Sequence, residues 1–215
     1  MTRFIIFILA LFIFTSAGKE LPKILIIGDS ISIGYTPFVK ESLKDKAIVI
    51  HNKGNAAHTG IGLKRLDEWL GEEKWDVIQF NWGLHDLCYR NPESKRQGHR
   101  DKVHGKLTTP LEQYQANMEE LVLRLQKTNA KLLFITTTYV PVNEAGRISG
   151  DEDKYNAAAL EVMKKYGIKV NDLNKTSREI HPKFGKDSGN VHYTPEGYRL
   201  LAEKITHGLE KILIK

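Results

Sequence analysis

The feature that most constrains the fold of this sequence is an alternation of short apolar runs with longer segments of helical periodicity. Turn-forming residues bound five apolar runs, at residues 23–27, 47–52, 75–81, 131–138 and 168–173. Between and after these runs, apolar residues recur at helical spacing in residues 60–70, 111–128, 154–167 and 195–213. Strands that alternate with helices in this way are joined by right-handed crossovers. The sequence therefore predicts a three-layer α/β/α sandwich around a parallel sheet of about five strands.

The first 17 residues have the composition of a secretory signal peptide. Arg3 gives a basic start, residues 4–14 are apolar, and Thr15 and Ala17 are small residues suited to a cleavage site. The apolar core is short for a membrane span. We expect cleavage near Ala17, with an uncleaved anchor as the alternative. The remaining residues 18–215 then form one exported domain, secreted or periplasmic, without stable membrane insertion.

Composition and spacing argue against several classes of function. The formal net charge is +6, and charges of both signs are mixed without the basic and aromatic pattern of a nucleic-acid module. The single cysteine, Cys88, cannot form an internal disulfide and lies in an apolar setting that makes a thiol inert. The histidine spacing fits neither a zinc helix nor a zinc finger, and no phosphate-binding glycine loop is present. We predict no nucleic-acid partner, no cofactor and no metal.

Polar and small residues follow the predicted strands. Residues 28–30 (GDS) follow the first run, Gly54 follows the second, and residues 83–86 (GLHD) follow the third. The carboxyl ends of parallel strands meet at one edge of the sheet, which is where such folds bind ligands. Far along the chain, His192 stands two residues before a Thr-Pro pair typical of a helix start. We expect these segments to meet in a functional site. Within them, we expect Gly28 to permit a sharp turn, Asp29 to have a structural role at that turn and Asp86 to brace its loop.

A serine hydroxyl next to a histidine can carry out acyl transfer. The hydroxyl needs an imidazole to accept its proton and hydrogen-bond donors to stabilise the developing oxyanion. Ser30 and His192 can supply the first pair, and the backbone N–H groups of Ser30 and Gly54 the second. Taken singly, each residue is an ordinary turn former, loop glycine or capping residue. The presence of all four segments in this order favours catalysis.

The same four segments resemble the GDSL or SGNH family of serine esterases and lipases. The resemblance extends over essentially the whole of residues 18–215. It implies the SGNH-hydrolase, flavodoxin-like form of the α/β/α sandwich. It also implies Ser30 as nucleophile, Gly54 as an oxyanion-hole amide and His192 as general base.

Two positions depart from the family pattern. The third block of the family usually carries an asparagine that donates to the oxyanion, whereas this sequence has His85. An imidazole N–H can also donate, so His85 is the candidate third donor, with Asn81 or Asn55 as alternatives. The family also places an aspartate three residues before the catalytic histidine, and this sequence has Gly189 there.

The sequence therefore leaves two candidates for the residue that orients His192. Asp187 lies five residues before the histidine and Asn190 two residues before it. Either side chain can hold the ring in the tautomer that acyl transfer needs. Both residues are candidates for this role.

The expected substrate is a short-chain acyl ester, most simply an acetyl ester on a small-molecule or polysaccharide carrier. Trp82, Tyr89 and Tyr139 lie at or beyond strand ends and can stack on sugar rings, although such residues are also common in cores. A long irregular stretch, residues 84–109, is expected to be functional or mobile. The alternatives are a lipid or lysophospholipid esterase and, because Gly189 replaces the expected aspartate, a weakly active or inactive carbohydrate-binding protein.

Overall fold

The computed structural model describes residues 20–214, so the predicted signal peptide (1–17) lies outside the described residues. In this described part of the chain, five parallel strands form the central sheet in the order β2-β1-β3-β6-β7. Their bounds are Lys23–Ile27 (β1), Ile48–His51 (β2), Val77–Phe80 (β3), Lys131–Ile135 (β6) and Lys169–Asn171 (β7). The predicted strand positions and the parallel topology are confirmed.

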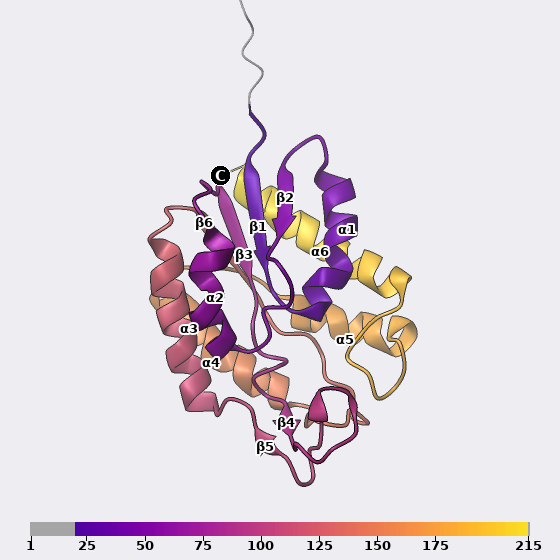
Figure 1. The fold of residues 1–215 in the computed structure, drawn as a ribbon. Helices are drawn as coiled ribbons and strands as arrows, with labels where there is room; N and C mark the ends of the chain where they lie inside the picture. The colour runs from indigo at the N-terminus through magenta and orange to yellow at the C-terminus, as the bar shows by residue number, and fades with distance from the viewer. Residues whose placement is uncertain (1–19, 215) are drawn as a thin grey trace, which may run out of the picture.

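Within residues 20–214, six α-helices cover the two faces of the sheet in two groups of three (Figure 1). On one face, α1 (Ser30–Leu43), α5 (Leu173–Phe184) and α6 (Pro195–Leu213) pack together; on the other, α2 (Thr59–Leu70), α3 (Leu111–Gln126) and α4 (Asp151–Lys165) do so. This arrangement is the predicted three-layer α/β/α sandwich. None of the helices described between residues 20 and 214 combines the length and apolar character needed to cross a membrane.

Burial explains why the strands differ in sequence. β1, β3 and β6 lie inside the sheet with helices on both faces, and Ile24, Ile26 and Phe134 are each 0 % exposed. Strands buried on both faces read as continuous apolar runs. β2 is an edge strand, and its alternating Ile48 and Ile50 are 41 % and 38 % exposed. β1 accordingly reads as an apolar run, KILII, and the GDS turn follows its end.

Two features were not predicted. Helix α5 begins directly after β7, with Asp172 as an N-cap that accepts from the Lys175 N–H. Its polar sequence and internal Pro182 weaken the helical pattern, although the N-cap was a usable signal. The stretch 84–109 contains a short antiparallel pair, β4 (Tyr89–Arg90) and β5 (Lys106–Leu107), with a 3₁₀ turn, η1 (Gln97–His99), between them. Two-residue strands are too short to show periodicity.

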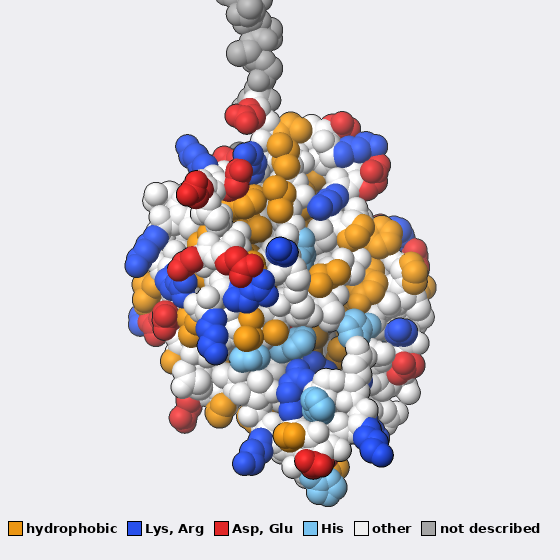
Figure 2. Space-filling view, viewed as in Figure 1, with side chains coloured by type: hydrophobic (Ala, Val, Ile, Leu, Met, Phe, Trp, Pro, Cys, Tyr) orange, Lys and Arg blue, Asp and Glu red, His pale blue; other side chains and the backbone are white. Residues whose placement is uncertain are grey.

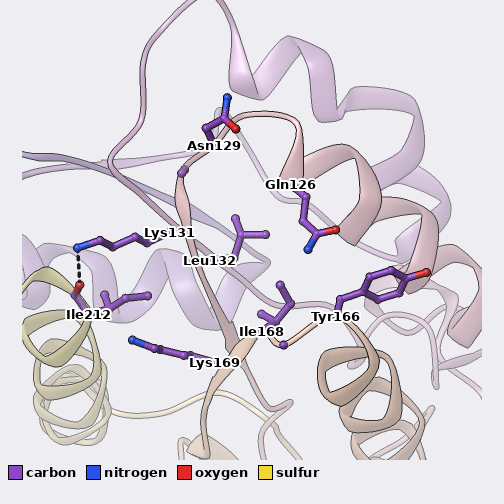
Figure 3. Close-up of a pocket in the computed structure, with 10 residues that line it drawn as sticks. Gln126, Asn129, Lys131, Leu132, Tyr166, Ile168, Lys169 and Ile212 are labelled. Atoms are coloured by element: carbon purple, nitrogen blue, oxygen red, sulfur yellow. Dashed lines mark hydrogen bonds between the residues drawn. The ribbon is translucent and has the colours of Figure 1, made fainter. Parts of the chain in front are cut away.

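The segments that follow the carboxyl ends of the strands collect at one edge of the sheet, and a cavity lies at the opposite edge. A cavity of about 430 Å³ is lined by Lys131 and Lys169, the first residues of β6 and β7, together with Tyr166 and Ile212 (Figure 3). It therefore lies at the amino ends of the strands. Ser30 follows the carboxyl end of β1, on the opposite edge, so this cavity is separate from the predicted site.

Candidate active site

Ser30 and His192 are brought together by the fold. Ser30 is the first residue of α1, three residues after the end of β1, and His192 lies in the segment before α6. The Ser30 Oγ and His192 Nε2 atoms are 2.9 Å apart, although 162 residues separate them in the chain. This distance is a hydrogen bond of ordinary length. A hydroxyl and an imidazole in this arrangement can exchange a proton.

Asn190 fixes the tautomer of His192. Its Oδ1 atom lies 2.7 Å from His192 Nδ1 and also accepts from the His192 backbone N–H at 3.0 Å. Because a backbone N–H only donates, the Asn190 atom must be the acceptor oxygen, and Nδ1 must carry a hydrogen. A neutral ring then presents a lone pair at Nε2. That lone pair faces the Ser30 hydroxyl, as a general base requires.

Asp187 does not take the orienting position. Its Oδ1 accepts from the Gly189 N–H at 2.9 Å, two residues on, which is a local turn typical of aspartate. Among the described residues, the hydrogen-bond partner of His192 Nδ1 is Asn190. Of the two candidates from sequence, the structure places Asn190 against the ring and Asp187 away from it.

The segment that carries His192 is held by backbone bonds to the end of α5. The Lys186 N–H donates to the His192 carbonyl at 2.8 Å, and the Thr194 N–H donates to the Phe184 carbonyl at 2.9 Å. Thr194 caps α6 by accepting from the Gly197 N–H, with Pro195 as the first helical residue, as predicted. The base is thus fixed by a predicted helix start and by an unpredicted helix.

His181 is a supporting residue that sequence reasoning missed. Its Nε2 lies 2.7 Å from the Asn190 carbonyl. Its ring packs in T-shaped geometry against Tyr139 and Tyr193, at centroid distances of 5.4 and 5.3 Å. The side chain is buried. No motif marks it, because its role arises only when α5 packs beside the His192 segment.

Asn52 joins the turns that follow β1 and β2. Its Oδ1 accepts from the Gly28 N–H at 2.9 Å, and its Nδ2 donates to the Gly54 carbonyl at 3.1 Å. The Ala56 N–H adds a bond to the Gly28 carbonyl at 3.0 Å. Gly54 has φ +77°, a conformation that favours glycine. Asn52 was not singled out from sequence, although it follows a strand end directly.

The two amide groups predicted for the oxyanion hole, those of Ser30 and Gly54, remain available for a ligand. Within residues 20–214, neither the Ser30 N–H nor the Gly54 N–H donates to another protein group. The Ser30 N–H stands at the amino end of α1, where backbone donors lack helical partners. Free donors of this kind are what an oxyanion hole contains.

The GDS turn has a different physical basis from the one expected. Gly28 does not have positive φ; a Cβ there would lie 2.6 Å from the Ser32 Oγ, so glycine is needed for close packing rather than for a sharp turn. Asp29 caps α1 by accepting from the Ile31 N–H at 2.9 Å, in the structural role predicted for it. Capping presents Ser30 at the helix start.

The ring of His85 lies beside the Asp29 carboxylate. Burial, with Arg147 and Arg90 adding to it, lowers the pKa of His85 to about 3, so its ring is neutral at ordinary pH. A neutral imidazole has one N–H to donate. Of the alternative donors, Asn81 Nδ2 is engaged, because it donates to the Ile135 carbonyl. Asn55 Oδ1 accepts from the Ala57 N–H, which does not use its Nδ2 donors, so Asn55 stays an alternative.

Asp86 braces the segment that carries His85. Its Oδ1 accepts from the Thr59 backbone N–H at 2.9 Å and from the Thr59 hydroxyl at 2.6 Å. Burial raises the pKa of Asp86 to about 6. This confirms the bracing role expected of it.

Burial and the positively charged groups around the site favour the neutral form of His192. Burial lowers the pKa of His192, and Arg147, Arg100 and Lys186 lower it further, whereas Asp29 acts in the opposite direction. Arg147 is buried and is fixed by donating to the Leu84 carbonyl at 2.6 Å and to Glu144 Oε1 at 3.1 Å. Sequence reasoning gave no signal for Arg147. A neutral His192 is the form that accepts a proton.

The three aromatic candidates for sugar stacking differ in exposure. Trp82 is 1 % exposed, and its Nε1 donates to the Ala56 carbonyl, so it belongs to the core and the prediction is wrong. The reason is that the strand end turns inward, where the ring packs against Gly62. Tyr89 and Tyr139 are half-buried. Tyr139 lines a hollow of about 370 Å³ that also includes Asp187.

The surface over this edge of the sheet is rich in histidine. Figure 2 shows several histidine side chains gathered with Lys and Arg near the middle and lower part of the displayed face, over the carboxyl ends of the strands and the loops beyond them. Within residues 20–214, no group of three or more His, Cys, Asp or Glu side chains is arranged to hold a metal ion.

Comparison with known families places the chain. Residues 26–200 match the GDSL-like Lipase/Acylhydrolase family. The chain belongs to this family. The match begins inside β1 and ends inside α6, so it includes both Ser30 and His192. As a member of the GDSL-like family, the protein is a serine ester hydrolase.

Solved structures share the fold of this GDSL-like hydrolase at low identity. An acetyl xylan esterase superposes with a TM-score of 0.67 at 20% identity, covering 85% of this chain and 97% of that one. A lipase/acylhydrolase from Enterococcus faecalis gives 0.69 at 21%, covering 89% and 96%. An acetylxylan esterase from Geobacillus stearothermophilus gives 0.69 at 19%, covering 87% and 94%. A search of curated protein sequences gave no match.

Proposed function

We propose that this hydrolase cleaves short-chain acyl esters, most simply acetyl esters of carbohydrates, through a covalent intermediate on Ser30. The observation that carries the proposal is the 2.9 Å bond between Ser30 Oγ and His192 Nε2, in a ring whose Nδ1–H is held by Asn190. Serine is a nucleophile only with such a base beside it.

The reaction has two balanced halves. Ser30 Oγ bonds to the ester carbonyl carbon while its proton moves to His192 Nε2, and the carbonyl oxygen becomes an oxyanion. The oxyanion receives hydrogen bonds from the N–H groups of Ser30 and Gly54 and from His85. The bond to the alcohol then breaks, and His192 returns its proton to the leaving oxygen. Water repeats the sequence on the acyl-enzyme and releases the acid and free Ser30.

The surroundings of Ser30 support a small acyl group on a polar carrier. The residues that act electrostatically on His192 and His85 include Asp29, Arg90, Arg100 and Arg147. A long alkyl chain gains nothing from desolvating charged groups. Two of the solved structures that share the fold are acetylxylan esterases, which supports the same substrate class. Tyr139, which lines a hollow, is our candidate for contact with a sugar.

Export of the enzyme is part of the proposal. Its support is the basic start at Arg3, the apolar residues 4–14 and the small residues at 15–17. Mass spectrometry of the protein produced in its own cells should find an N-terminus near Gly18. A chain that keeps residues 1–17 and stays in the membrane fraction would support the uncleaved anchor instead.

The esterase proposal is tested with purified protein on 4-nitrophenyl acetate, butyrate and octanoate, on acetylated xylooligosaccharides and on a lysophospholipid. We expect acetyl esters to be cleaved fastest and a fluorophosphonate probe to label Ser30. Ser30→Ala and His192→Ala should each reduce turnover by at least about 10³-fold without loss of the fold.

Three results would contradict parts of this proposal. Preference for octanoate and the lysophospholipid would point to a lipid esterase. Absence of labelling, with binding of xylooligosaccharide retained, would indicate a carbohydrate-binding protein. Full activity in folded Ser30→Ala or His192→Ala would exclude the catalytic pair.

A further inference from the structure

The ring of His85 spans the space between Arg90 and Asp29. Its Nδ1 atom lies 3.3 Å from Arg90 Nη2, and its Nε2 atom lies 3.9 Å from Asp29 Oδ2. Asp29 immediately precedes Ser30, so the Nε2 side of the ring faces the start of α1 and the Nδ1 side faces β4. The two ring nitrogens therefore face different chemistry.

Arg90 determines which nitrogen of His85 carries the hydrogen. A guanidinium has only N–H donors and no acceptor. The Nδ1 atom that receives Arg90 must therefore present a lone pair, and the hydrogen of the neutral ring must be on Nε2. The distance of 3.9 Å to Asp29 is too long for a hydrogen bond, so the Nε2–H is not used by the carboxylate. It remains available beside Ser30.

Arg90 is itself held in place by the irregular stretch 84–109. Its Nε donates to Thr108 Oγ1 at 3.2 Å, and its Nη1 donates to the Gly98 carbonyl. Thr108 is fixed in turn by a 2.7 Å bond to the Cys88 carbonyl. Gly98 has φ +70°, and a Cβ there would lie 2.9 Å from Arg90 Nη1. Three donors of one guanidinium thus connect β4, the residue after β5 and the turn η1 to His85.

We propose that Arg90 is a positioning residue that holds His85 as the neutral Nε2–H tautomer, so that His85 donates to the oxyanion. The inference rests on the esterase mechanism proposed above. An asparagine amide donates without any choice of tautomer, whereas a histidine donates from Nε2 only if Nδ1 is kept free of hydrogen. Arg90 supplies what the change from asparagine to histidine requires.

The electrostatic surroundings agree with this assignment. The charged and titratable groups near the ring are Asp29 before α1, His58 before α2, Arg90 on β4, Arg147 before α4 and His192 before α6. Burial and the positively charged neighbours lower the pKa of His85, so the ring is neutral at ordinary pH. The tautomer then decides whether it can donate.

A double-mutant cycle separates positioning from simple support of the loop. His85→Ala should lower kcat by about 10² to 10³-fold, as for loss of an oxyanion donor. Arg90→Met should lower kcat by about tenfold, a part of that effect, with little change in KM. In a His85→Asn background, Arg90→Met should cost little further, because asparagine needs no tautomer control. Arg90→Lys, which keeps a donor and the charge, should restore part of the loss.

Nuclear magnetic resonance gives a readout that does not depend on turnover. In protein labelled with ¹⁵N-histidine, the wild-type His85 nitrogens should report hydrogen on Nε2, and Arg90→Met should shift the ring toward a mixture of tautomers. Arg96→Met, an exposed arginine in the same stretch, is the control for loss of one positive charge and should change neither measurement.

Two results would overturn the inference. An equal kcat loss from Arg90→Met in the wild-type and His85→Asn backgrounds would show that Arg90 only supports the loop. Unchanged ¹⁵N shifts of His85 in Arg90→Met would show that the tautomer is set elsewhere. Both are distinct from failure of the esterase mechanism, which would appear as activity that does not depend on Ser30 in the wild-type background.

Discussion

Helix α1 carries two serines that each share a hydrogen bond with a histidine. Ser30 Oγ lies 2.9 Å from His192 Nε2, and Ser32 Oγ lies 2.7 Å from His51 Nε2. In both rings Nδ1 faces an amide oxygen, that of the Asn190 side chain at 2.7 Å or that of the Asn52 backbone at 2.8 Å. The two imidazoles therefore have the same bonding pattern.

The pairs differ in what surrounds the hydroxyl. Ser32 is 3 % exposed, and its Oγ also lies 2.7 Å from the Asp29 carbonyl. Ser30 is half-buried at the start of the helix, where its own N–H has no acceptor among residues 20–214. Two residues along a helix point about 200° apart, so the helix directs Ser30 to the open edge and Ser32 inward. Ser30 and His192 are called the outer pair below, and Ser32 and His51 the inner pair. A base makes a serine a nucleophile only where an ester can reach it and donors await the oxyanion.

The largest expected effect separates these two serines. Ser30→Ala should reduce kcat on 4-nitrophenyl acetate by at least about 10³-fold while leaving the fold intact. Ser32→Ala should leave turnover close to wild type, because no ester reaches its hydroxyl, but should leave His51 Nε2 without its partner. Unpairing such a group lowers the free energy of unfolding by about 1 to 3 kcal/mol, measured in urea.

The same two variants can contradict the distinction. If folded Ser32→Ala loses turnover as severely as Ser30→Ala, the inner pair takes part in the chemistry. If Ser32→Ala is as stable as wild type, its bond to His51 contributes nothing to folding. Labelling by a fluorophosphonate adds an independent measure, since only the outer serine should react.

The part of the site that sequence could predict is the part set by local signals. The apolar run of β1 predicts a buried strand, and the Asp29 cap places Ser30 at the first position of α1. Thr194 and Pro195 mark the start of α6, which fixes the neighbourhood of His192. These signals act within a few residues, and the topology rules for parallel sheets do the rest.

The part that sequence could not predict depends on contacts between distant segments. Asn52 links two turns, Arg147 reaches the Leu84 carbonyl, and Arg90 reaches His85 across the irregular stretch 84–109. None of these side chains stands in a spacing pattern. Trp82 was wrongly expected to face a sugar, because its position just after a strand does not determine whether the ring points to solvent or into the core. The choice between Asp187 and Asn190 likewise needed the path of one loop.

A smaller effect is expected from charging the acceptor on the outer ring. Both rings have a neutral oxygen at Nδ1, and Asn190→Asp would give His192 alone a carboxylate. Because Asn190 already fixes the tautomer, the gain comes only from stabilising the imidazolium. A charge-assisted bond exceeds a neutral one by about 1 kcal/mol, which corresponds to about fivefold in kcat.

The pH profile gives the sign of this effect. Burial first, and then Arg147, Arg100 and Lys186, lower the pKa of His192 from 6.5, so wild-type kcat/KM should fall only below that pH as the base is protonated. The new carboxylate favours the charged ring and raises its pKa, which moves the acid limb to higher pH. The gain should therefore be complete near pH 8 and shrink on acidification.

Asp187→Asn is the matched control for this change in charge. It removes the other carboxylate of the loop, whose Oδ1 bonds to the Gly189 N–H rather than to His192, and an asparagine oxygen can keep that bond. We expect neither kcat nor the acid limb to move. A shifted limb in Asp187→Asn, or unchanged turnover and pH profile in folded Asn190→Asp, would assign orientation of the ring to the wrong residue. Because the inner ring has a backbone carbonyl at Nδ1, no side-chain substitution can charge its acceptor, and only the outer pair can be tuned this way.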